Sequence, residues 1–221
     1  MKKIIIISAG GHALELLEYI EYINDVSKTK IYDVLGFIDV SKESYNQYKP
    51  KYSFIGLIKE HTIKKDAYYI LGVGDIKIRE LEINAFKKKG AKFETIIHPT
   101  ALISKTATIG EGSVISHNAS VGPHAKIGPF NLINSRCTIG HDSIMGTNNF
   151  LSPQVVLGGN SELGNGNMMG TNSCVLPKIS VGDNNTIMAG MVLSKKVEDN
   201  ETVFYRYKEK VYIKSNKKNE Q

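Results

Sequence analysis

The chain has 221 residues, of which 41% are hydrophobic and 23% are charged, and its formal net charge is +6 at pH 7. This length suits one large domain or two modest ones, and no stretch approaches the roughly 20 apolar residues of a membrane span. The basic tail could favour anionic ligands, but it lacks the interleaved aromatic residues of a nucleic-acid-binding module. We therefore expect a soluble protein that binds neither nucleic acid nor membrane.

The start of the chain and its cysteines agree with a cytoplasmic protein. The segment Met1–Ser8 has too short an apolar run for a signal peptide and leads directly into a folded-looking motif. Cys137 and Cys174 lie inside a repeat described below, at small or neighbouring positions. We expect both to fill the core in a reducing compartment rather than to form a disulfide or act as a nucleophile.

The first 96 residues predict an α/β domain. Strands are predicted over residues 3–8, 34–39, 68–73 and 93–97, and helices over residues 13–23 and 76–89. The first strand runs into the turn Ala9-Gly10-Gly11-His12, the second ends in Asp39, and the third is followed by Gly74. A strand, a glycine turn, a helix and a strand that ends in an acid form the beginning of a Rossmann-like unit.

The glycine turn does not predict a dinucleotide cofactor. Its pattern falls short of G-x-G-x-x-G, and Asp39 lies 28 residues past Gly11. A helix N-terminus beside Gly10 and Gly11 is nevertheless a suitable site for a phosphate. The alternative is that the glycines only form a tight turn.

A six-residue repeat dominates the rest of the chain. From Ile97 to Leu193 every sixth residue, which we call the repeat residue, is aliphatic or Met. Gly follows it in nine of seventeen cases, and Ala, Ser, Cys or Asn stands two places before it in thirteen of sixteen. This period fits neither a helix nor a strand meander, and an ordinary β-sandwich is the improbable alternative. It predicts a parallel β-helix with three faces and about 18 residues per coil.

The repeat has a simple physical basis. One apolar side chain per unit points into a narrow prism, and the small residue beside it lets the chain bend at the corner. We expect the glycines to supply backbone angles that a Cβ would forbid. Stability comes from the stacking of coils, so an isolated coil would not fold.

His141 is the candidate catalytic residue. It follows the repeat residue Ile139 by two places, so we expect it at a coil corner, facing outward, with Asp142 directly after it. An imidazole beside a carboxylate suits proton transfer near neutral pH. Gly159 stands 18 residues later, and stacked coils lie about 4.8 Å apart, so the two corners should be neighbours. The alternative is a surface histidine on a loop.

These features resemble a known family. The A-G-G-H turn, the order of the two domains and Gly140-His141-Asp142 are similar to the sialic acid O-acetyltransferase / nucleotide-amino-sugar N-acetyltransferase family, over about residues 1–195. The resemblance implies a Rossmann-like nucleotide-sugar-binding domain over residues 1–96 and a left-handed β-helix acyltransferase domain over residues 97–195. A C-terminal capping segment and basic tail would follow over residues 196–221.

The resemblance also implies a reaction. Members of this family acetylate UDP- or dTDP-linked 4-amino-6-deoxysugars for bacterial surface glycans, as in the bacillosamine pathway. Direct transfer from acetyl-CoA would use His141 as the general base, Asp142 as its partner and the N–H of Gly159 as oxyanion donor, without a metal. The family implies a homotrimer with sites between subunits. Open alternatives are O-acetylation of sialic acid or a related sugar, transfer of another acyl group, and a non-catalytic scaffold.

Binding residues follow from the same resemblance. The sugar nucleotide would contact Gly10, Gly11, His12, Asp39 and Gly74, and acetyl-CoA would contact Phe150, Gly158, Gly159 and Gly170. Two departures stand out. Phe150 replaces a histidine that the family usually has, and the family's G-V-P-A-K-like end is replaced by residues 203–213, whose alternation predicts a capping strand or hairpin.

The other histidines do not predict a metal site. His117 and His124 invite comparison with the zinc ligands of hexapeptide-repeat carbonic anhydrases, but the chain has no His-x4-His pair. Residues 117 and 141 are 24 apart, which places them on different faces of the prism. We expect His98, which precedes Pro99, to be structural.

Overall fold

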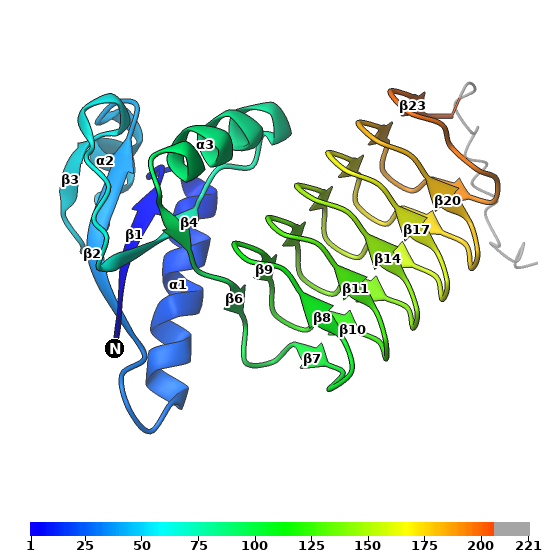
Figure 1. The fold of residues 1–221 in the computed structure, drawn as a ribbon, viewed down its shortest axis with the longest axis horizontal. Helices are drawn as coiled ribbons and strands as arrows, with labels where there is room; N and C mark the ends of the chain where they lie inside the picture. The colour runs from blue at the N-terminus through cyan, green and yellow to red at the C-terminus, as the bar shows by residue number, and fades with distance from the viewer. Residues whose placement is uncertain (206–221) are drawn as a thin grey trace, which may run out of the picture.

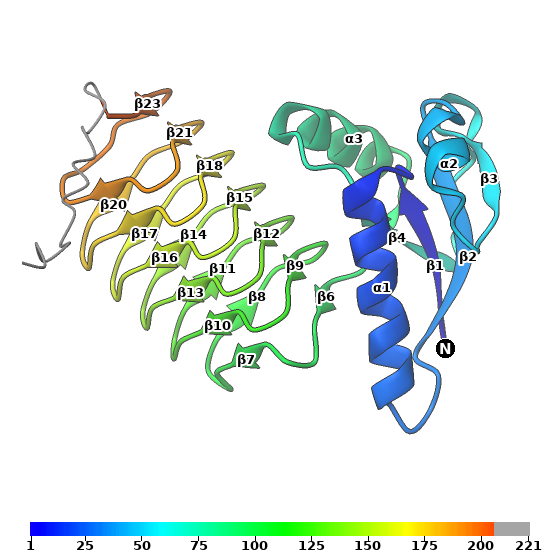
Figure 2. The same cartoon turned by 180° about the vertical axis from the view of Figure 1, so that it is seen from behind.

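The computed structural model describes residues 1–205. The basic tail and most of the predicted C-terminal hairpin lie outside these residues. Figures 1 and 2 show an α/β domain at one end of an elongated prism, whose coils recede from it towards the C-terminus.

The α/β domain is a parallel sheet in the order β3-β2-β1-β4-β5. In chain order its elements are β1 (Lys2–Ile7), α1 (Gly11–Val26), β2 (Tyr32–Asp39), α2 (Glu43–Tyr48), β3 (Phe54–Leu57), a 3-10 turn (Ile58–Glu60), β4 (Ala67–Leu71), α3 (Ile76–Lys88) and β5 (Lys92–Phe93). Ile4 and Ile6 pack in a cluster with α1, whereas Ile5 and Ile7 pack with Ile83 of α3. Because helices cover both faces, the central strand is a continuous apolar run.

The predicted Rossmann-like domain is therefore confirmed, with two differences. The strand predicted over residues 93–97 is two elements, since β5 ends the α/β sheet and β6 (Ile96–Ile97) begins the β-helix. Between them Glu94 is buried and accepts hydrogen bonds from Lys2 and Tyr32. The second difference is that α2 and β3 were not predicted, because residues 40–57 show no clear periodicity.

The β-helix consists of three parallel sheets. The domain-facing sheet contains β6, β9 (Val114–Ile115), β12 (Leu132–Ile133), β15 (Phe150–Leu151), β18 (Met168–Met169), β21 (Thr186–Ile187) and β23 (Thr202–Val203). The second sheet contains β7 (Leu102–Ile103), β10 (Ser120–Val121), β13 (Thr138–Ile139), β16 (Val156–Leu157), β19 (Cys174–Val175) and β22 (Val192–Leu193). The third sheet contains β8 (Thr108–Ile109), β11 (Lys126–Ile127), β14 (Ile144–Met145), β17 (Glu162–Leu163) and β20 (Ser180–Val181).

The predicted coil length and core are confirmed. Strands β6 to β22 pair with a register of 18 residues, as in Val121 with Ile139 and Ile139 with Leu157, and the last pairing, of Thr186 with Thr202, spans 16. From Ile115 onward the repeat residues are buried in one continuous core, which also takes the small residue two places earlier. The left-handed β-helix thus follows directly from the six-residue period.

The expected reason for the glycines was wrong. The left-handed backbone conformation recurs every sixth residue from position 112 to 190, but three places after the repeat residue, and only three of these positions are Gly. The glycines directly after the repeat residue are needed for another reason, because the next coil passes too close. A Cβ on Gly140 would lie 2.5 Å from the backbone N of Gly159, and one on Gly158 would lie 2.6 Å from N of Pro177.

One corner of the prism holds a buried asparagine ladder. Asn131, Asn149, Asn167 and Asn185 occupy equivalent places in successive coils and are almost completely buried. The side-chain oxygen of each accepts a backbone N–H of the next coil at 2.6–2.9 Å, and Glu201 supplies the last one. Where the sequence suggested only small residues that permit bending, these side chains supply hydrogen bonds to groups that a corner would leave unpaired.

The two domains share a core. Ile96, Val114 and Leu132 of the domain-facing sheet lie in the same buried cluster as Leu16 and Ile20 of α1. This packing fixes the α/β domain against one sheet of the β-helix, and it determines where each part of the candidate site lies.

Arg79 of α3 forms the buried hydrogen bonds that connect the two domains. Its side chain is fully buried and donates to Oδ1 of Asn148 at 3.1 Å and to the carbonyls of Val73 and Phe130, both at 2.8 Å. Burial lowers the pKa of Arg79 to about 10, still far above neutrality, so the guanidinium stays charged. No carboxylate forms an ion pair with it within residues 1–205.

Candidate active site

The corner between β13 and β14 presents His141 to solvent. Its Nδ1 donates to Oδ2 of Asp142 at 2.8 Å, and the imidazole is 61% exposed. Asp142 has the left-handed conformation that recurs at each corner, with φ of 56°. Because Nδ1–H faces an acceptor, the lone pair of the neutral ring is on Nε2, which is free to take a proton.

Gly159 lies directly beside this nitrogen. A Cβ at Gly159 would be 2.6 Å from Nε2 of His141, so only glycine leaves room for the ring. Among residues 1–205 no protein acceptor takes the backbone N–H of Gly159. A base and an unpaired amide donor therefore stand side by side, which is the arrangement needed for acyl transfer through a tetrahedral intermediate.

The second candidate region is the start of α1. Gly10 precedes the first helical residue with φ of −78°, and no side chain caps the helix. Asp39 is buried and accepts the N–H of Ala9 at 2.8 Å and that of Val40 at 2.6 Å. Asp39 thus holds the turn in place, and the first N–H groups of α1 remain available to an anion.

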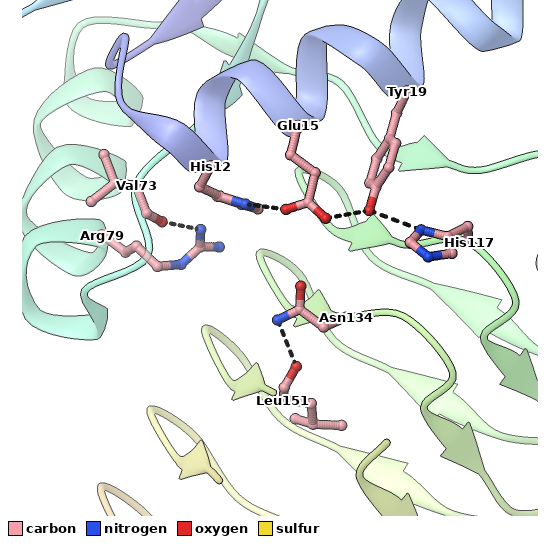
Figure 3. Close-up of polar contacts among 8 residues, drawn as sticks. All are labelled: His12, Glu15, Tyr19, Val73, Arg79, His117, Asn134 and Leu151. Atoms are coloured by element: carbon pink, nitrogen blue, oxygen red, sulfur yellow. Dashed lines mark hydrogen bonds and ion pairs between the residues drawn. The ribbon is translucent and has the colours of Figure 1, made fainter. Parts of the chain in front are cut away.

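His12 lies in the first turn of this helix. Its Nδ1 faces Oε2 of Glu15 at 3.2 Å, and its Nε2 is buried without a partner among the described residues. Figure 3 shows His12, Glu15 and Tyr19 in a row along α1, with Asn134 of the β-helix below them. A buried ring nitrogen with no partner is costly unless a ligand supplies one.

Gly74 and Phe150 meet where α3 approaches the domain-facing sheet. A Cβ at Gly74 would lie 3.5 Å from Cε2 of Phe150, and Phe150 packs partly buried against the core of the α/β domain. Gly74 also lines a groove of about 680 Å³ between the start of α3 and the outer coils, together with Asp75, Met168 and Thr202. Phe150 and Gly74 are therefore neighbours within one chain.

The predicted site residues do not all converge in one chain. His141 stands at the corner between the second and third sheets, which in a triangular prism is opposite the domain-facing sheet. The start of α1, Gly74 and Phe150 lie on the domain-facing side. Gly158 lies in the same corner as Gly159, and Gly170 occupies another tight contact, since its Cβ would be 2.5 Å from N of Ala189.

Sequence reasoning missed several polar residues at the domain junction. Asn134 donates from Nδ2 to the carbonyl of Leu151 at 2.9 Å, and its Oδ1 accepts no hydrogen bond among the described residues (Figure 3). Glu15 could have been found, because a spacing of three places it on the same helix face as His12. Arg79 could not, since nothing in an amphipathic helix marks one arginine for burial.

The described part of the chain lacks two features, a cluster of metal-binding side chains and a membrane-spanning helix. Between residues 1 and 205 no three His, Cys, Asp or Glu side chains gather closely enough to hold a metal ion. None of the helices there is both long and apolar enough to span a bilayer.

The fold and the comparisons with known proteins together indicate the class of protein. A left-handed hexapeptide β-helix preceded by an α/β domain is the architecture of two-domain hexapeptide-repeat acyltransferases. Residues 3–86 match the family model described as the PglD N-terminal domain. The predicted resemblance to the sialic acid O-acetyltransferase / nucleotide-amino-sugar N-acetyltransferase family is confirmed.

Individual relatives agree with this assignment. UDP-N-acetylbacillosamine N-acetyltransferase of Bacillus subtilis (strain 168) is 29% identical over 116 residues, which cover 52% of this chain and 51% of the relative. The match thus spans about half the length of that protein.

Among solved structures, the acetyltransferase domain of PglB from Neisseria gonorrhoeae FA1090, in complex with acetyl coenzyme A, superposes with a TM-score of 0.78. It is 25% identical, with 91% of this chain and 95% of that chain covered. PerB from Caulobacter crescentus, in complex with CoA and GDP-perosamine, superposes with a TM-score of 0.77 at 21% identity, covering 91% and 93%. The second likeness shows the fold alone.

Proposed function

We propose that this protein transfers an acetyl group from acetyl-CoA to the amine of a nucleotide-linked 4-amino-6-deoxysugar, with UDP or dTDP as the nucleotide. The observation that carries the proposal is the pairing of His141 with Asp142 directly beside Gly159, whose N–H has no acceptor among residues 1–205. The names of the bacillosamine and PglB relatives support the acceptor and the donor. The reaction serves surface-glycan synthesis in the cytoplasm.

The corner supplies the groups that direct transfer needs. Nε2 of His141 takes a proton from the acceptor amine as that nitrogen attacks the thioester carbonyl. The oxyanion that forms accepts a hydrogen bond from the N–H of Gly159, and Asp142 stabilises the imidazolium. Collapse of the intermediate breaks the C–S bond, and the imidazolium returns its proton to the CoA thiolate.

No covalent acyl-enzyme is part of this mechanism. Cys137 is completely buried, and burial raises the pKa of its thiol to about 12. Burial also raises the pKa of Cys174. Because a nucleophilic cysteine needs a lowered pKa and access to substrate, neither thiol suits that role.

The complete site requires more than one chain. The nucleotide end, with Gly10, Gly11, His12 and Asp39, lies on the side of the prism opposite His141. A homotrimer of side-by-side β-helices would bring the His141 corner of one copy to the α/β domain of its neighbour. Acetyl-CoA would lie between the copies, along Gly158, Gly159 and Gly170 and near Phe150.

A thiol-release assay tests the proposal. Acetyl-CoA is offered with UDP- and dTDP-4-amino-6-deoxysugars, free sialic acid or no acceptor, and products are identified by mass spectrometry. We expect rapid release with one nucleotide sugar and a loss of at least about a hundredfold in His141→Ala. His124→Ala, which removes an exposed imidazole one coil from Asp142, is the matched control and should stay active.

Three results would contradict the proposal. Release with sialic acid alone would establish O-acetylation instead. Silence with every acceptor, from a protein that still binds CoA, would exclude this acceptor class. Equal activity of His141→Ala and the wild type would remove His141 from the mechanism.

A further inference from the structure

A chain of hydrogen bonds runs along α1 and crosses to the β-helix. The hydroxyl of Tyr19 donates to Oε1 of Glu15 at 2.6 Å, and the hydroxyl oxygen of Tyr19 lies 3.3 Å from Nδ1 of His117. His12 faces the other carboxylate oxygen of Glu15 at 3.2 Å. Figure 3 shows the four side chains in line, three from the α/β domain and one from the prism.

The chemistry of these groups fixes the direction of each bond. A carboxylate only accepts, so both Tyr19 O–H and His12 Nδ1–H donate to Glu15. The single proton of Tyr19 is then used, and its oxygen accepts from Nδ1–H of His117. Each imidazole is therefore held in one tautomer, with its Nε2 lone pair directed away from the chain of bonds.

Glu15 is well suited to be the centre of this chain. The hydrogen bond from His12, and to a smaller degree that from Tyr19, holds the pKa of Glu15 below its ordinary range, against the effect of burial. The carboxylate therefore stays ionised at working pH. Tyr19 is buried, and burial together with Glu15 keeps its hydroxyl protonated.

We propose that Glu15 is a positioning residue for the nucleotide-sugar site, because it fixes the tautomer and orientation of His12. Tyr19 and His117 connect Glu15 to the β-helix. This inference rests on the proposed function, because it takes the sugar nucleotide as the ligand that contacts His12. Nε2 of His12, which is buried and has no partner among residues 1–205, marks the place where the ligand donates a hydrogen bond. Candidate donors on such a ligand are sugar hydroxyls and the imide N–H of the base.

The tautomer of His12 can be measured without any ligand. Long-range ¹⁵N–¹H spectra of histidine-labelled protein, assigned with His12→Gln, should show Nδ1 protonated in the wild type. Glu15→Ala should change this to a mixture of both tautomers. Glu18→Ala is the matched control, since Glu18 is exposed on the same helix and forms no part of the chain of bonds.

Binding and kinetics give the second readout. In calorimetry with UDP and dTDP, and in steady-state assays, we expect Glu15→Ala to raise Kd and KM for the nucleotide sugar about tenfold, the size of one lost charge-assisted hydrogen bond. The value of kcat should change little, because such a contact is made equally in the ground and transition states. Glu15→Gln, which retains one acceptor, should recover part of the loss, and Tyr19→Phe should show a smaller one.

The two readouts separate the possible failures. An unchanged His12 tautomer in Glu15→Ala, or an unchanged Kd with a lower kcat, would overturn the positioning role. If the tautomer of His12 changes in Glu15→Ala but the wild type binds neither UDP nor dTDP, the result would support the Glu15–His12 coupling and contradict the proposed substrate. Melting curves that match those of Glu18→Ala would show that the effects do not arise from unfolding.

Discussion

The α-carbon of Gly159 lies so close to the imidazole of His141 that a single added methyl group would reach within 2.6 Å of Nε2. Within residues 1–205 this glycine N–H has no protein acceptor. Because Gly159 has no side chain, the imidazole of His141, one coil earlier, has room beside it.

Gly159→Ala should therefore damage activity without damaging the fold. His141 is exposed, so its ring can swing away from the new methyl, and the melting temperature should stay close to that of the wild type. We expect kcat to fall about a hundredfold, because a displacement of about 1 Å of a reacting group has effects of this size.

Gly158→Ala is the matched control for that substitution. There a Cβ meets the backbone of Pro177 at 2.6 Å, which cannot move aside, so this variant should lose stability first. Thermal melting and CoA release, measured on both variants, check the contrast. Full activity in Gly159→Ala would contradict the role of the corner.

Mixed oligomers should reveal whether the site is shared between copies. His12→Ala and His141→Ala should each be inactive alone, because one lacks a nucleotide contact and the other lacks the base. Co-expression with two different tags, followed by tandem purification, yields mixed assemblies in which an intact α/β domain can face an intact His141. Activity restored in the mixture supports a site between copies, and its absence in a stable mixed trimer contradicts it.

The asparagine ladder should be a large contributor to stability. Asn149→Ala removes a side chain that bonds to Asn131 and to the carbonyl of Gly164, and it leaves buried groups in two coils without partners. We expect a loss of about 3 kcal/mol in the free energy of unfolding, measured in urea. Asn165→Ala, at an exposed position of the next coil, should cost less than about 1 kcal/mol, and equal losses would contradict the importance of burial.

Arg79→Met should destabilise the junction of the two domains. It leaves two carbonyls and the side chain of Asn148 without their donor, so we expect a loss of about 3 kcal/mol. Arg136→Met, at an exposed corner, should change stability by less than about 0.5 kcal/mol. Similar losses in the two variants would show that the buried hydrogen bonds of Arg79 matter little.

The pH dependence of the Arg79 effect follows from its pKa. The folded pKa of about 10 lies below the ordinary 12.5, so the unfolded chain holds this proton more tightly, and titration of Arg79 changes the free energy of unfolding, by raising it, only as pH rises above about 10. The difference between wild type and Arg79→Met should therefore be constant from about pH 6 to pH 9, which urea titrations at several pH values can check.

The periodic parts of the structure could be predicted from sequence because one residue type at fixed spacing determines them. The six-residue period gave the coils, and adding 18 to position 141 placed Gly159 beside His141. The turn at Gly10 and Gly11 likewise located the start of α1. Each of these predictions uses only local spacing or a constant register.

The remaining features depend on contacts between distant segments. The burial of Arg79 arises from packing of α3 on a corner some 50 to 70 residues later in the chain. The reason for the inter-coil glycines is the approach of a neighbouring coil rather than their own backbone angles. Phe150 appeared in the sequence as a departure from the family, and only the fold shows that it packs against the α/β domain near Gly74.

Because successive coils repeat every 18 residues, the length of the prism can change only in steps of one coil if later residues are to keep their faces. A segment of 18 residues inserted into the outer coils would lengthen the molecule by one turn and return every later residue to its original face. A segment of six would rotate all later side chains by one third of a turn, so outward groups would exchange sheets. Length can therefore vary in this architecture without disturbing the geometry around His141, provided that it changes by whole turns.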